Sequence, residues 1–213
     1  MLKLINALSI LLCMRGKGRH IAFEGIDGSG KTSVASELFL RIRAVGRPCY
    51  YTYEPTDSRI GSYIRLHLMK ERDHHPSYEA LLYAADRVQH FYGEILDYRK
   101  KGYVVLSDRY VYSSIAYQGA MLRDPQWVSQ INKMVPKPDL TIYFRVSPDL
   151  ALSRKKLRRR TIYEHEDFLR NVIKIYEKLV KAKLLIAVDA SRPFNTVLKE
   201  CCDTVGDFIG ERL

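Results

Sequence analysis

Residues 25–32 contain the glycines, lysine and threonine of a loop that binds phosphate. They read Gly25-Ile26-Asp27-Gly28-Ser29-Gly30-Lys31-Thr32, which is the pattern G-x-x-x-x-G-K-T. In such a loop the backbone amides point inward at a di- or triphosphate, Lys31 adds positive charge near the β- and γ-phosphates, and the Thr32 hydroxyl can bind Mg²⁺. The loop therefore predicts a nucleoside triphosphate such as ATP as ligand, with Mg²⁺ as cofactor.

Acidic and basic side chains follow a second apolar segment, at residues 103–106. Asp108 beside a phosphate loop commonly binds Mg²⁺, directly or through a water. Arg109 can offer a planar, bidentate fork to a phosphate. The alternative is that Asp108 and Arg109 pair with each other or cap the next helix. Because the phosphate loop is in the same chain, we favour the metal and phosphate roles.

Tyr83 and Arg87 lie four residues apart in a segment with helical periodicity, so they share one face of the predicted helix. A ring beside a guanidinium suits a planar base joined to a phosphate, because the ring stacks on the base while the guanidinium binds the anion. Without further context, such a pair is more often part of a core edge and a surface.

The elements that must position these residues alternate between strand and helix. Strands are predicted over residues 20–24, 49–53, 103–106, 140–144 and 184–188. Helices are predicted after the phosphate loop as far as Gly46, over residues 60–70, 77–99, 167–180 and 197–209, and from Pro148 onward. This pattern favours an α/β fold with a five-stranded parallel sheet and helices on both faces. Ligands of such folds bind at the carboxyl ends of the strands.

Four segments in this order resemble the thymidylate kinase family. They are the loop with Glu24 before it, the pair Glu54-Pro55, residues 82–87 (LYAADR), and residues 108–119 (DRYVYSSIAYQG). The resemblance covers about residues 18–180. It implies a three-layer fold of P-loop NTPase type, a homodimer, and transfer of a phosphoryl group from Mg-ATP to dTMP, giving dTDP and ADP.

The resemblance also implies roles for single residues. Asp27 would reach the 3′-hydroxyl of the acceptor, Tyr83 would stack on thymine, and Arg87 and Arg109 would hold the acceptor phosphate. Tyr117 would lie against the deoxyribose and leave no room for a 2′-hydroxyl. Candidates for the base edge are Ser113 and Gln118. The implied substrate-binding residues are Asp27, Glu54, Tyr83, Arg87, Arg109, Ser113, Tyr117 and Gln118.

A basic run at residues 154–160 has two interpretations. It could be a solvated helix face, but phosphoryl transfer needs positive charge around the γ-phosphoryl oxygens. In the resembled family, this charge comes from an arginine in the loop or from arginines in a mobile lid. Residues 26–29 contain no arginine. We therefore expect a lid at about residues 154–166, and the predicted catalytic residues are Lys31, Arg109, Arg154, Arg158, Arg159 and Arg160.

The chain departs from the resembled pattern around the Glu-Pro pair. Many family members have an arginine before this pair and glycines after it, whereas this chain has Tyr53 before it and Thr56-Asp57 after it. Arg59 is a candidate for the missing phosphate contact. Because the acceptor oxygen of a monophosphate is already anionic, no general base is assigned.

Composition fits one domain with an anionic ligand. The chain has 213 residues and a formal net charge of +11, which suggests nucleotides, nucleic acid or a membrane surface as partner. We expect nucleotides alone, since no nucleic-acid module is recognisable. A less favoured alternative is a nucleic-acid-binding ATPase. Another is a deoxynucleoside kinase with Glu24 or Glu54 as base, in which Arg87 and Arg109 would face a missing phosphate.

The N-terminus and the cysteines bear on localisation. Residues 4–13 are apolar but too short to cross a membrane, and no cleavage site follows them. We expect residues 1–13 to be an extension and residues 14–213 to be a single kinase domain. The four cysteines, at positions 13, 49, 201 and 202, have no metal-binding spacing. A reducing cytoplasm fits this cysteine usage.

Overall fold

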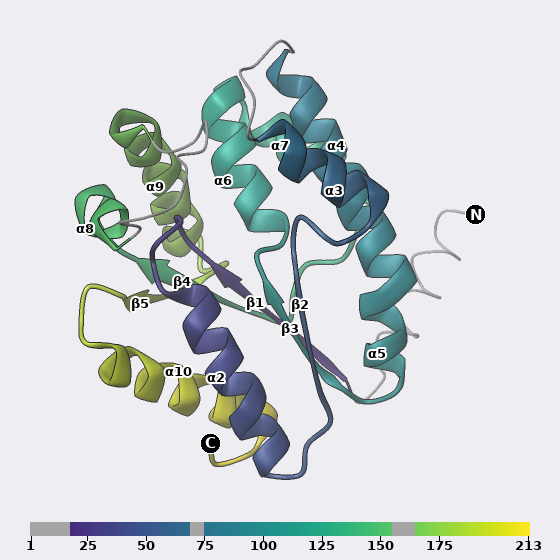
Figure 1. Cartoon of the computed structure of the whole chain (residues 1–213), viewed down its shortest axis with the longest axis vertical. Coiled ribbons are helices and arrows are strands. Elements are labelled where there is room, and N and C mark those ends of the chain that lie inside the picture. The colour runs from purple at the N-terminus through teal and green to yellow at the C-terminus, as the bar shows by residue number, and fades with distance from the viewer. Residues whose placement is uncertain (1–17, 69–74, 155–164) are drawn as a thin grey trace.

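Five parallel strands form the centre of the molecule (Figure 1). The sheet has the order β2-β3-β1-β4-β5, which confirms the predicted five-stranded parallel sheet. The strands are β1 (Arg19–Glu24), β2 (Cys49–Tyr53), β3 (Val104–Asp108), β4 (Leu140–Arg145) and β5 (Ile186–Asp189). Every residue of β3 is buried, as expected for a strand that is covered on both faces.

This computed structural model describes residues 18–68, 75–154 and 165–213. The predicted extension at residues 1–13 lies outside the described residues. So does most of the predicted lid, including Arg158, Arg159 and Arg160.

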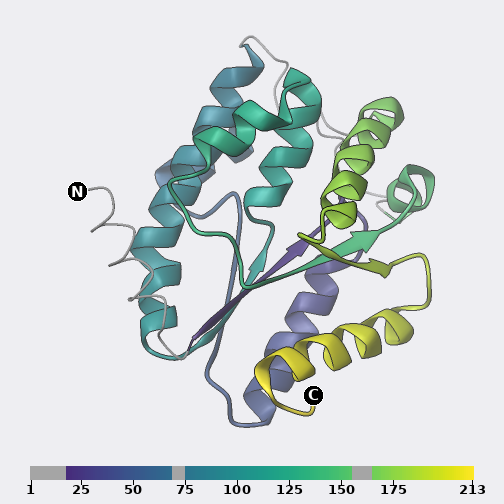
Figure 2. The same ribbon diagram turned by 180° about the vertical axis from the view of Figure 1, so that it is seen from behind.

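Helices cover both faces of the sheet (Figures 1 and 2). Helices α2 (Lys31–Ala44) and α10 (Phe194–Ile209) pack on one face. The other face is covered by α4 (Pro76–His90), α5 (Leu96–Lys100), α6 (Val111–Leu122) and α9 (Glu166–Lys181). Shorter helices lie outside this layer, namely α3 (Arg59–His67), α7 (Pro125–Ile131) and α8 (Pro148–Ser153).

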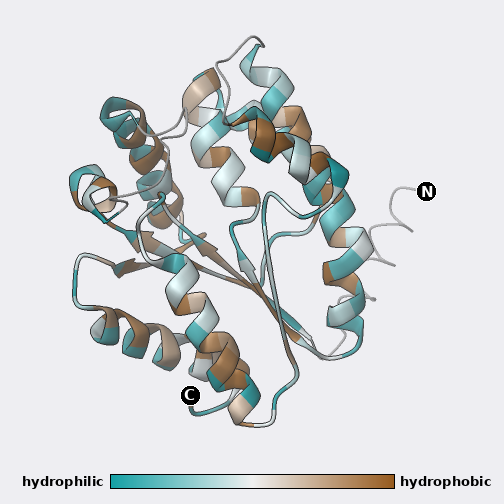
Figure 3. Ribbon diagram, in the orientation of Figure 1, coloured by the Kyte–Doolittle hydropathy of each residue, from teal (hydrophilic) through white to brown (hydrophobic). Residues whose placement is uncertain are grey.

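The hydropathy of the residues follows these layers (Figure 3), with apolar strands inside and polar helix surfaces outside. Helix α9 shows the rule, because Leu169, Val172 and Tyr176 are buried at intervals of three and four residues. None of the helices that the structure describes is long and apolar enough to span a membrane.

Helices α6 and α7 are missing from the predicted pattern, and two predicted helices are interrupted or end early. The helix predicted over residues 77–99 is interrupted by a π-helical turn, Phe91–Ile95, between α4 and α5. The helix predicted to begin at Pro148 is α8, and it ends at Ser153, before the basic run.

The strand register brings the predicted functional segments together. Asp108, at the end of β3, pairs with Phe23 of β1 and with Tyr53 of β2. The amide of Glu54 donates to the carbonyl of Asp108 at 3.1 Å, and the amide of Arg109 donates to the carbonyl of Phe23 at 2.9 Å. Glu54 and Arg109 therefore leave the sheet side by side, next to the phosphate loop.

Candidate active site

The phosphate loop connects β1 to α2 and depends on its glycines. Gly25, Gly28 and Gly30 have φ angles of 148°, 83° and 90°, in a region that other residues rarely adopt. A Cβ atom on Gly28 would lie 2.2 Å from the carbonyl oxygen of Ala151 in α8. Glycine at position 28 therefore lets α8 lie against the loop.

Lys31 is buried beside its own loop. Its ammonium lies 3.6 Å from Oδ1 of Asp27 and 3.5 Å from the carbonyl oxygen of Ile26. Burial, and then the charge of Arg109, lower the pKa of Lys31. A buried cation at a loop of inward-facing amides is suited to bind a phosphate anion.

Thr32 and Asp108 form a pair of oxygen donors at the end of β3. The Thr32 hydroxyl donates to Oδ2 of Asp108, and the Tyr51 hydroxyl lies 3.4 Å from the same oxygen. Oδ1 of Asp108 is buried and has no hydrogen-bond partner among the described residues. Oxygen donors of this kind fit Mg²⁺, which binds proteins through one or two carboxylates together with phosphates and waters.

Arg109 has a strained backbone, with a φ angle of 73°. Its guanidinium donates to Oδ1 of Asp27 and to Oγ of Ser113, the latter at 3.0 Å. The same group lies 5.1 Å from the ring centroid of Tyr117, within cation–π range. Asp27, Ser113 and Tyr117 together fix where this positive charge points.

Glu24 supports Arg109 from behind. Its carboxylate accepts hydrogen bonds from the amide of Tyr110 at 3.0 Å, from Oγ of Ser113 at 2.5 Å and from the hydroxyl of Tyr176 at 3.0 Å. Burial raises the pKa of Glu24. Since these bonds occupy the carboxylate, Glu24 positions its neighbours and is not directed at a ligand.

Arg87 is held by several acceptors in the core. Its Nε and Nη2 atoms donate to Oε2 of Glu54 at 2.9 and 2.6 Å. Its Nη1 donates to the side chain of Asn132, and its Nη2 also donates to the carbonyl of Tyr110. These hydrogen bonds occupy four of the five guanidinium N–H groups. The second N–H of Nη1 has no acceptor within residues 18–68, 75–154 and 165–213, so it is available to a ligand.

A cavity of about 360 Å³ opens beside these residues. All eight predicted substrate-binding residues line it, from Asp27 in the loop to Gln118 in α6. The remaining lining residues were not predicted, and they are Pro55, Arg65, Leu68 and Ser114. The cavity is therefore assembled from all four of the segments that the sequence singled out.

Arg65, rather than the candidate Arg59, comes from α3 to the cavity. Its Nη1 donates to the carbonyl of Pro55 at 2.7 Å and also to the carbonyl of Thr56, and its Nη2 donates to Oδ1 of Asp57 at 2.9 Å. Arg65 thus holds the segment after Glu54. Little in the sequence singled out Arg65. An arginine inside a predicted helix after the Glu-Pro pair looks like any arginine on a helix surface.

Two further cavities lie at the phosphate loop. A cavity of about 410 Å³ is lined by Lys31, Thr32 and Asp108 and shares Asp27, Glu54 and Arg109 with the first cavity. On the other side of the loop, a cavity of about 240 Å³ is lined by Ser29, Gly30, Ser33, Val34, Arg154, Ala190, Arg192, Phe194 and Val197. All three cavities include residues of the phosphate loop.

Arg154 is the one predicted lid arginine within the described residues. It follows the last residue of α8, and its Nη1 donates to the carbonyl of Ala190 at 2.9 Å. A larger hollow, of about 790 Å³, lies between α2, α10 and the C-terminal residues. It contains none of the predicted site residues, so volume alone does not identify the site.

The comparisons with known proteins agree with this geometry. A family model described as thymidylate kinase matches residues 23–201. A protein of Staphylothermus marinus named probable thymidylate kinase is 42% identical over 186 residues, which cover 86% of this chain and 92% of that protein. A protein of Brachyspira hyodysenteriae named thymidylate kinase is 34% identical over 192 residues, covering 89% and 94%. The chain belongs to the thymidylate kinase family.

Proposed function

We propose that the chain transfers the γ-phosphoryl group of ATP to dTMP and produces dTDP and ADP. One observation carries this proposal. Asp27, Glu54 and Arg109 line both the cavity beside the phosphate loop and the cavity with Tyr83. A donor phosphate on the loop and an acceptor phosphate in the cavity would therefore meet at Arg109. Such positioning supplies much of the catalysis in phosphoryl transfer.

The acceptor would lie in the cavity of about 360 Å³. Tyr83 would stack on its base, and Ser113 and Gln118 would contact the base edge. Tyr117 and Asp27 would contact the deoxyribose. Arg109 would bind the acceptor phosphate, while Arg87 and Glu54 line the same cavity. Since Glu54 occupies the forked edge of Arg87, that arginine would give the nucleotide a single donor.

Positive charge for the transition state would come from two sides. Lys31 and Arg109 line the cavity between the nucleotides, and Arg154 lies across the loop, where the lid arginines Arg158, Arg159 and Arg160 would join it. The acceptor phosphate is already anionic and needs no base. Glu24 and Glu54, the bases that a nucleoside kinase would need, are engaged by other side chains.

Thr32 and Asp108 would hold Mg²⁺, since the unpartnered oxygen of Asp108 fits such an ion. When bound, Mg²⁺ would neutralise charge on the β- and γ-phosphates. The backbone amides of residues 25–32 would bind the phosphates of ATP. Its base would lie in the cavity of about 240 Å³, next to Arg192 and Phe194, because a ring and a guanidinium can stack on a purine.

We place the enzyme in the cytoplasm as a homodimer. The described cysteines, Cys49, Cys201 and Cys202, are free and buried, which agrees with a reducing compartment. Helices α3 and α4 expose large apolar side chains, which favours contact with a second copy. We expect no nucleic acid or membrane partner.

Coupled detection of ADP release tests the function. ATP is supplied with dTMP, dUMP, dCMP, dGMP or thymidine, and dTDP is identified by chromatography. We expect the highest kcat/KM with dTMP and no turnover of thymidine. Faster turnover of thymidine than of dTMP, or ATP hydrolysis without any acceptor, would overturn the proposal.

A further inference from the structure

A buried chain of charged groups runs from the acceptor cavity to the edge of the sheet. Arg87 binds one oxygen of Glu54, and His90 binds the other, with Nδ1 at 3.0 Å from Oε1. On the far side, Nε2 of His90 lies 2.8 Å from Oγ1 of Thr52 and 3.6 Å from Oε1 of Glu94. The side chains of Arg87, Glu54 and His90 are at most 2% exposed.

The hydrogen bonds favour a protonated His90. The Thr52 hydroxyl donates its one proton to Glu94 at 2.9 Å. Because an anionic carboxylate is the stronger acceptor, this donation is favoured over donation to the ring, and the hydroxyl then accepts the bond from Nε2 of His90. The Glu54 carboxylate, already bound by Arg87, accepts from Nδ1. Both ring nitrogens are then donors, so the ring carries a positive charge.

Electrostatics agree with this assignment. Burial alone would lower the pKa of His90, but hydrogen bonds with Glu54 and Glu94 outweigh it and raise that pKa to about 9. Interaction with His90 is the largest cause that lowers the pKa of Glu94 to about 2. Among the described residues, other charged or titratable groups nearby include Arg87 on the same helix, Tyr50 beside Glu94, Tyr110 beside Glu54 and His20 in β1, whose own pKa burial holds well below its usual range.

We propose that His90 is a positioning residue of the acceptor site, where its imidazolium holds the Glu54 carboxylate that in turn aligns the Arg87 guanidinium. When the His90 ring is charged, the row of Arg87, Glu54, His90 and Glu94 alternates between positive and negative groups. A neutral ring leaves two carboxylates against one guanidinium. Glu54 then loses a donor, and its hold on the Arg87 guanidinium beside the cavity weakens, while Asn132 and the Tyr110 carbonyl still bind Arg87.

The π-helical turn builds this arrangement. It begins at Phe91, directly after His90, and includes Glu94. In β2, Tyr50 donates to Oε1 of Glu94 at 2.8 Å, which anchors that carboxylate near Thr52. Turns of this kind occur frequently at functional sites. The Glu94 carboxylate, although 36% exposed, lies within reach of His90, Tyr50 and Thr52.

The proposal rests on dTMP being the acceptor, and the first test is independent of catalysis. In ¹⁵N NMR spectra of the labelled full chain at about pH 7.5, both ring nitrogens of His90 should show the shifts of protonated imidazolium. A neutral tautomer at that pH would overturn the proposal whether or not the chain is a kinase.

The second test separates acceptor effects from donor effects. His90→Gln should raise KM for dTMP by about tenfold or more and leave KM for ATP within about twofold. In the wild type, kcat/KM for dTMP should fall as pH rises through about 9, and this inflection should be absent in His90→Gln. His75→Gln, an exposed histidine at the start of the same helix, is the matched control and should behave as the wild type.

Glu94→Gln retains the His90 imidazole, so this variant can test the proposal if His90→Gln does not fold. It removes one of the two carboxylates that face His90, so the inflection should move to lower pH by about one unit. An unchanged profile in Glu94→Gln, or an unchanged KM for dTMP in His90→Gln, would overturn the proposal. If the wild type neither binds nor converts dTMP, the proposed function fails, and the NMR result still decides the charge of His90.

Discussion

Single side chains in this site act in pairs, and burial decides how strongly each pair matters. Arg87 and Glu54 form a forked ion pair that is almost completely buried. Arg145 and Glu177 form a fork of similar geometry, with both contacts at 2.7 Å, but the arginine side chain is 47% exposed. The protein therefore contains a natural comparison between a buried and an exposed pair.

Truncation of Arg87 should destabilise the fold far more than truncation of Arg145. Arg87→Ala leaves Glu54 with one cationic partner in the core, which typically costs about 3–5 kcal/mol. Arg145→Ala breaks an exposed pair and should cost about 0–1 kcal/mol. Urea unfolding followed by circular dichroism measures both. Equal losses would show that the Arg87 pair contributes through something other than buried charge.

At the residue scale, the sequence predicted which side chains lie together better than it predicted how they pair with one another. The eight predicted substrate-binding residues all line one cavity, because their motifs follow strand ends that the parallel sheet brings level. The partner of Arg87 could not be predicted, since Glu54 lies 33 residues away in the chain. Sequence spacing indicates which face of a helix Arg87 occupies, but it does not indicate which carboxylate binds the guanidinium.

At the scale of elements, the phosphate loop and α8 are packed without room for a side chain between them. Gly28 and Gly46 have similar φ angles, 83° and 80°. A Cβ atom would clash with Ala151 at position 28 and would meet nothing within 4 Å at position 46. Both glycines thus adopt a positive φ angle, but only Gly28 is closely approached by α8.

Alanine at positions 28 and 46 should distinguish the cost of a positive φ angle from the cost of a clash with α8. Gly46→Ala should cost about 1–2 kcal/mol of folding free energy from its positive φ angle, with ATP binding unchanged. Gly28→Ala should in addition weaken ATP binding by about tenfold or more, because the loop amides must move. Calorimetric titration with ATP measures the difference. Similar ATP affinities in the two variants would contradict the close fit of loop and helix.

The predicted lid can be tested without reference to its conformation. Replacement of Arg158, Arg159 and Arg160 by glutamine should lower kcat by about 100-fold or more, because arginines at the transferred group typically contribute on the order of 10³–10⁵. ATP should still bind. Glutamine at Lys174, Lys178 and Lys181, exposed on α9, removes the same charge elsewhere. If both triple variants turn over at the wild-type rate, residues 158–160 have no catalytic role.

Two elements show why parts of the fold escaped prediction. Helix α6 buries nine of its twelve residues, so it has no polar face and no period that pattern analysis could detect. The π turn at Phe91–Ile95 preserves the helical spacing of apolar residues around it, and the sequence gives no local signal for one extra residue in a turn. Both are set by tertiary packing.

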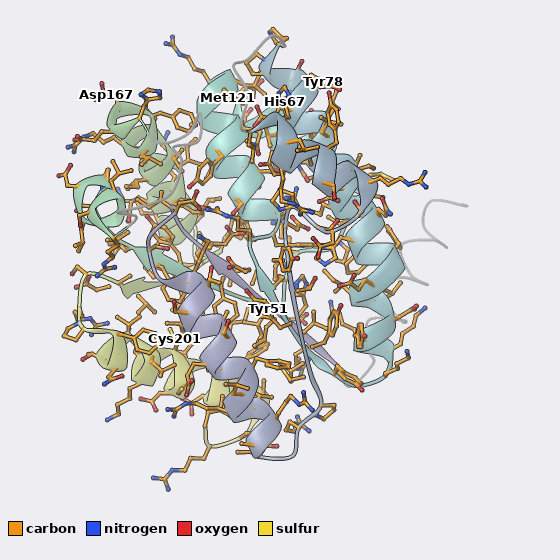
Figure 4. The ribbon with its side chains drawn as sticks, in the orientation of Figure 1. Tyr51, His67, Tyr78, Met121, Asp167 and Cys201 are labelled. Carbon is orange, nitrogen blue, oxygen red and sulfur yellow. The ribbon has the colours of Figure 1, made fainter. Side chains whose placement is uncertain are left out.

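At the scale of the whole molecule, helices α3 and α4 together expose several large apolar side chains. Tyr63 and Leu66 of α3 and Leu81 of α4 are 43%, 67% and 50% exposed. His67 and Tyr78, whose rings lie 6.3 Å apart, mark the end where these helices meet (Figure 4). An apolar surface of this kind is typical of an interface. It agrees with the proposed homodimer.

Negative charges introduced on the exposed apolar surface of α3 and α4 should dissociate the proposed dimer. Sedimentation equilibrium should give about twice the 24.7 kDa chain mass for the wild type. Leu66→Glu combined with Leu81→Glu should give the single-chain mass. Leu40→Glu, at a leucine that is 60% exposed on α2, is the control and should leave the dimer intact. A monomeric wild type would contradict the homodimer, and a dimer that persists in the double variant would place its interface elsewhere.

Stability should also depend on pH through His90. Its pKa is about 9 in the folded chain against an ordinary value of 6.5, so between these values the folded state binds more protons than the unfolded state. The contribution of His90 to the free energy of unfolding should therefore be fully present below about pH 6.5 and be lost as pH rises through about 9, by at most about 1.4 kcal/mol per pH unit.

His90→Gln should remove this contribution, and its stability should vary less with pH across the same window. His75→Gln should retain the wild-type slope, because that histidine is exposed. Urea unfolding at about pH 6, 7.5 and 9.5 measures all three proteins. Parallel curves for the wild type and His90→Gln would mean that His90 gains no proton affinity on folding. In that case the buried row from Arg87 to Glu94 would not depend on an imidazolium.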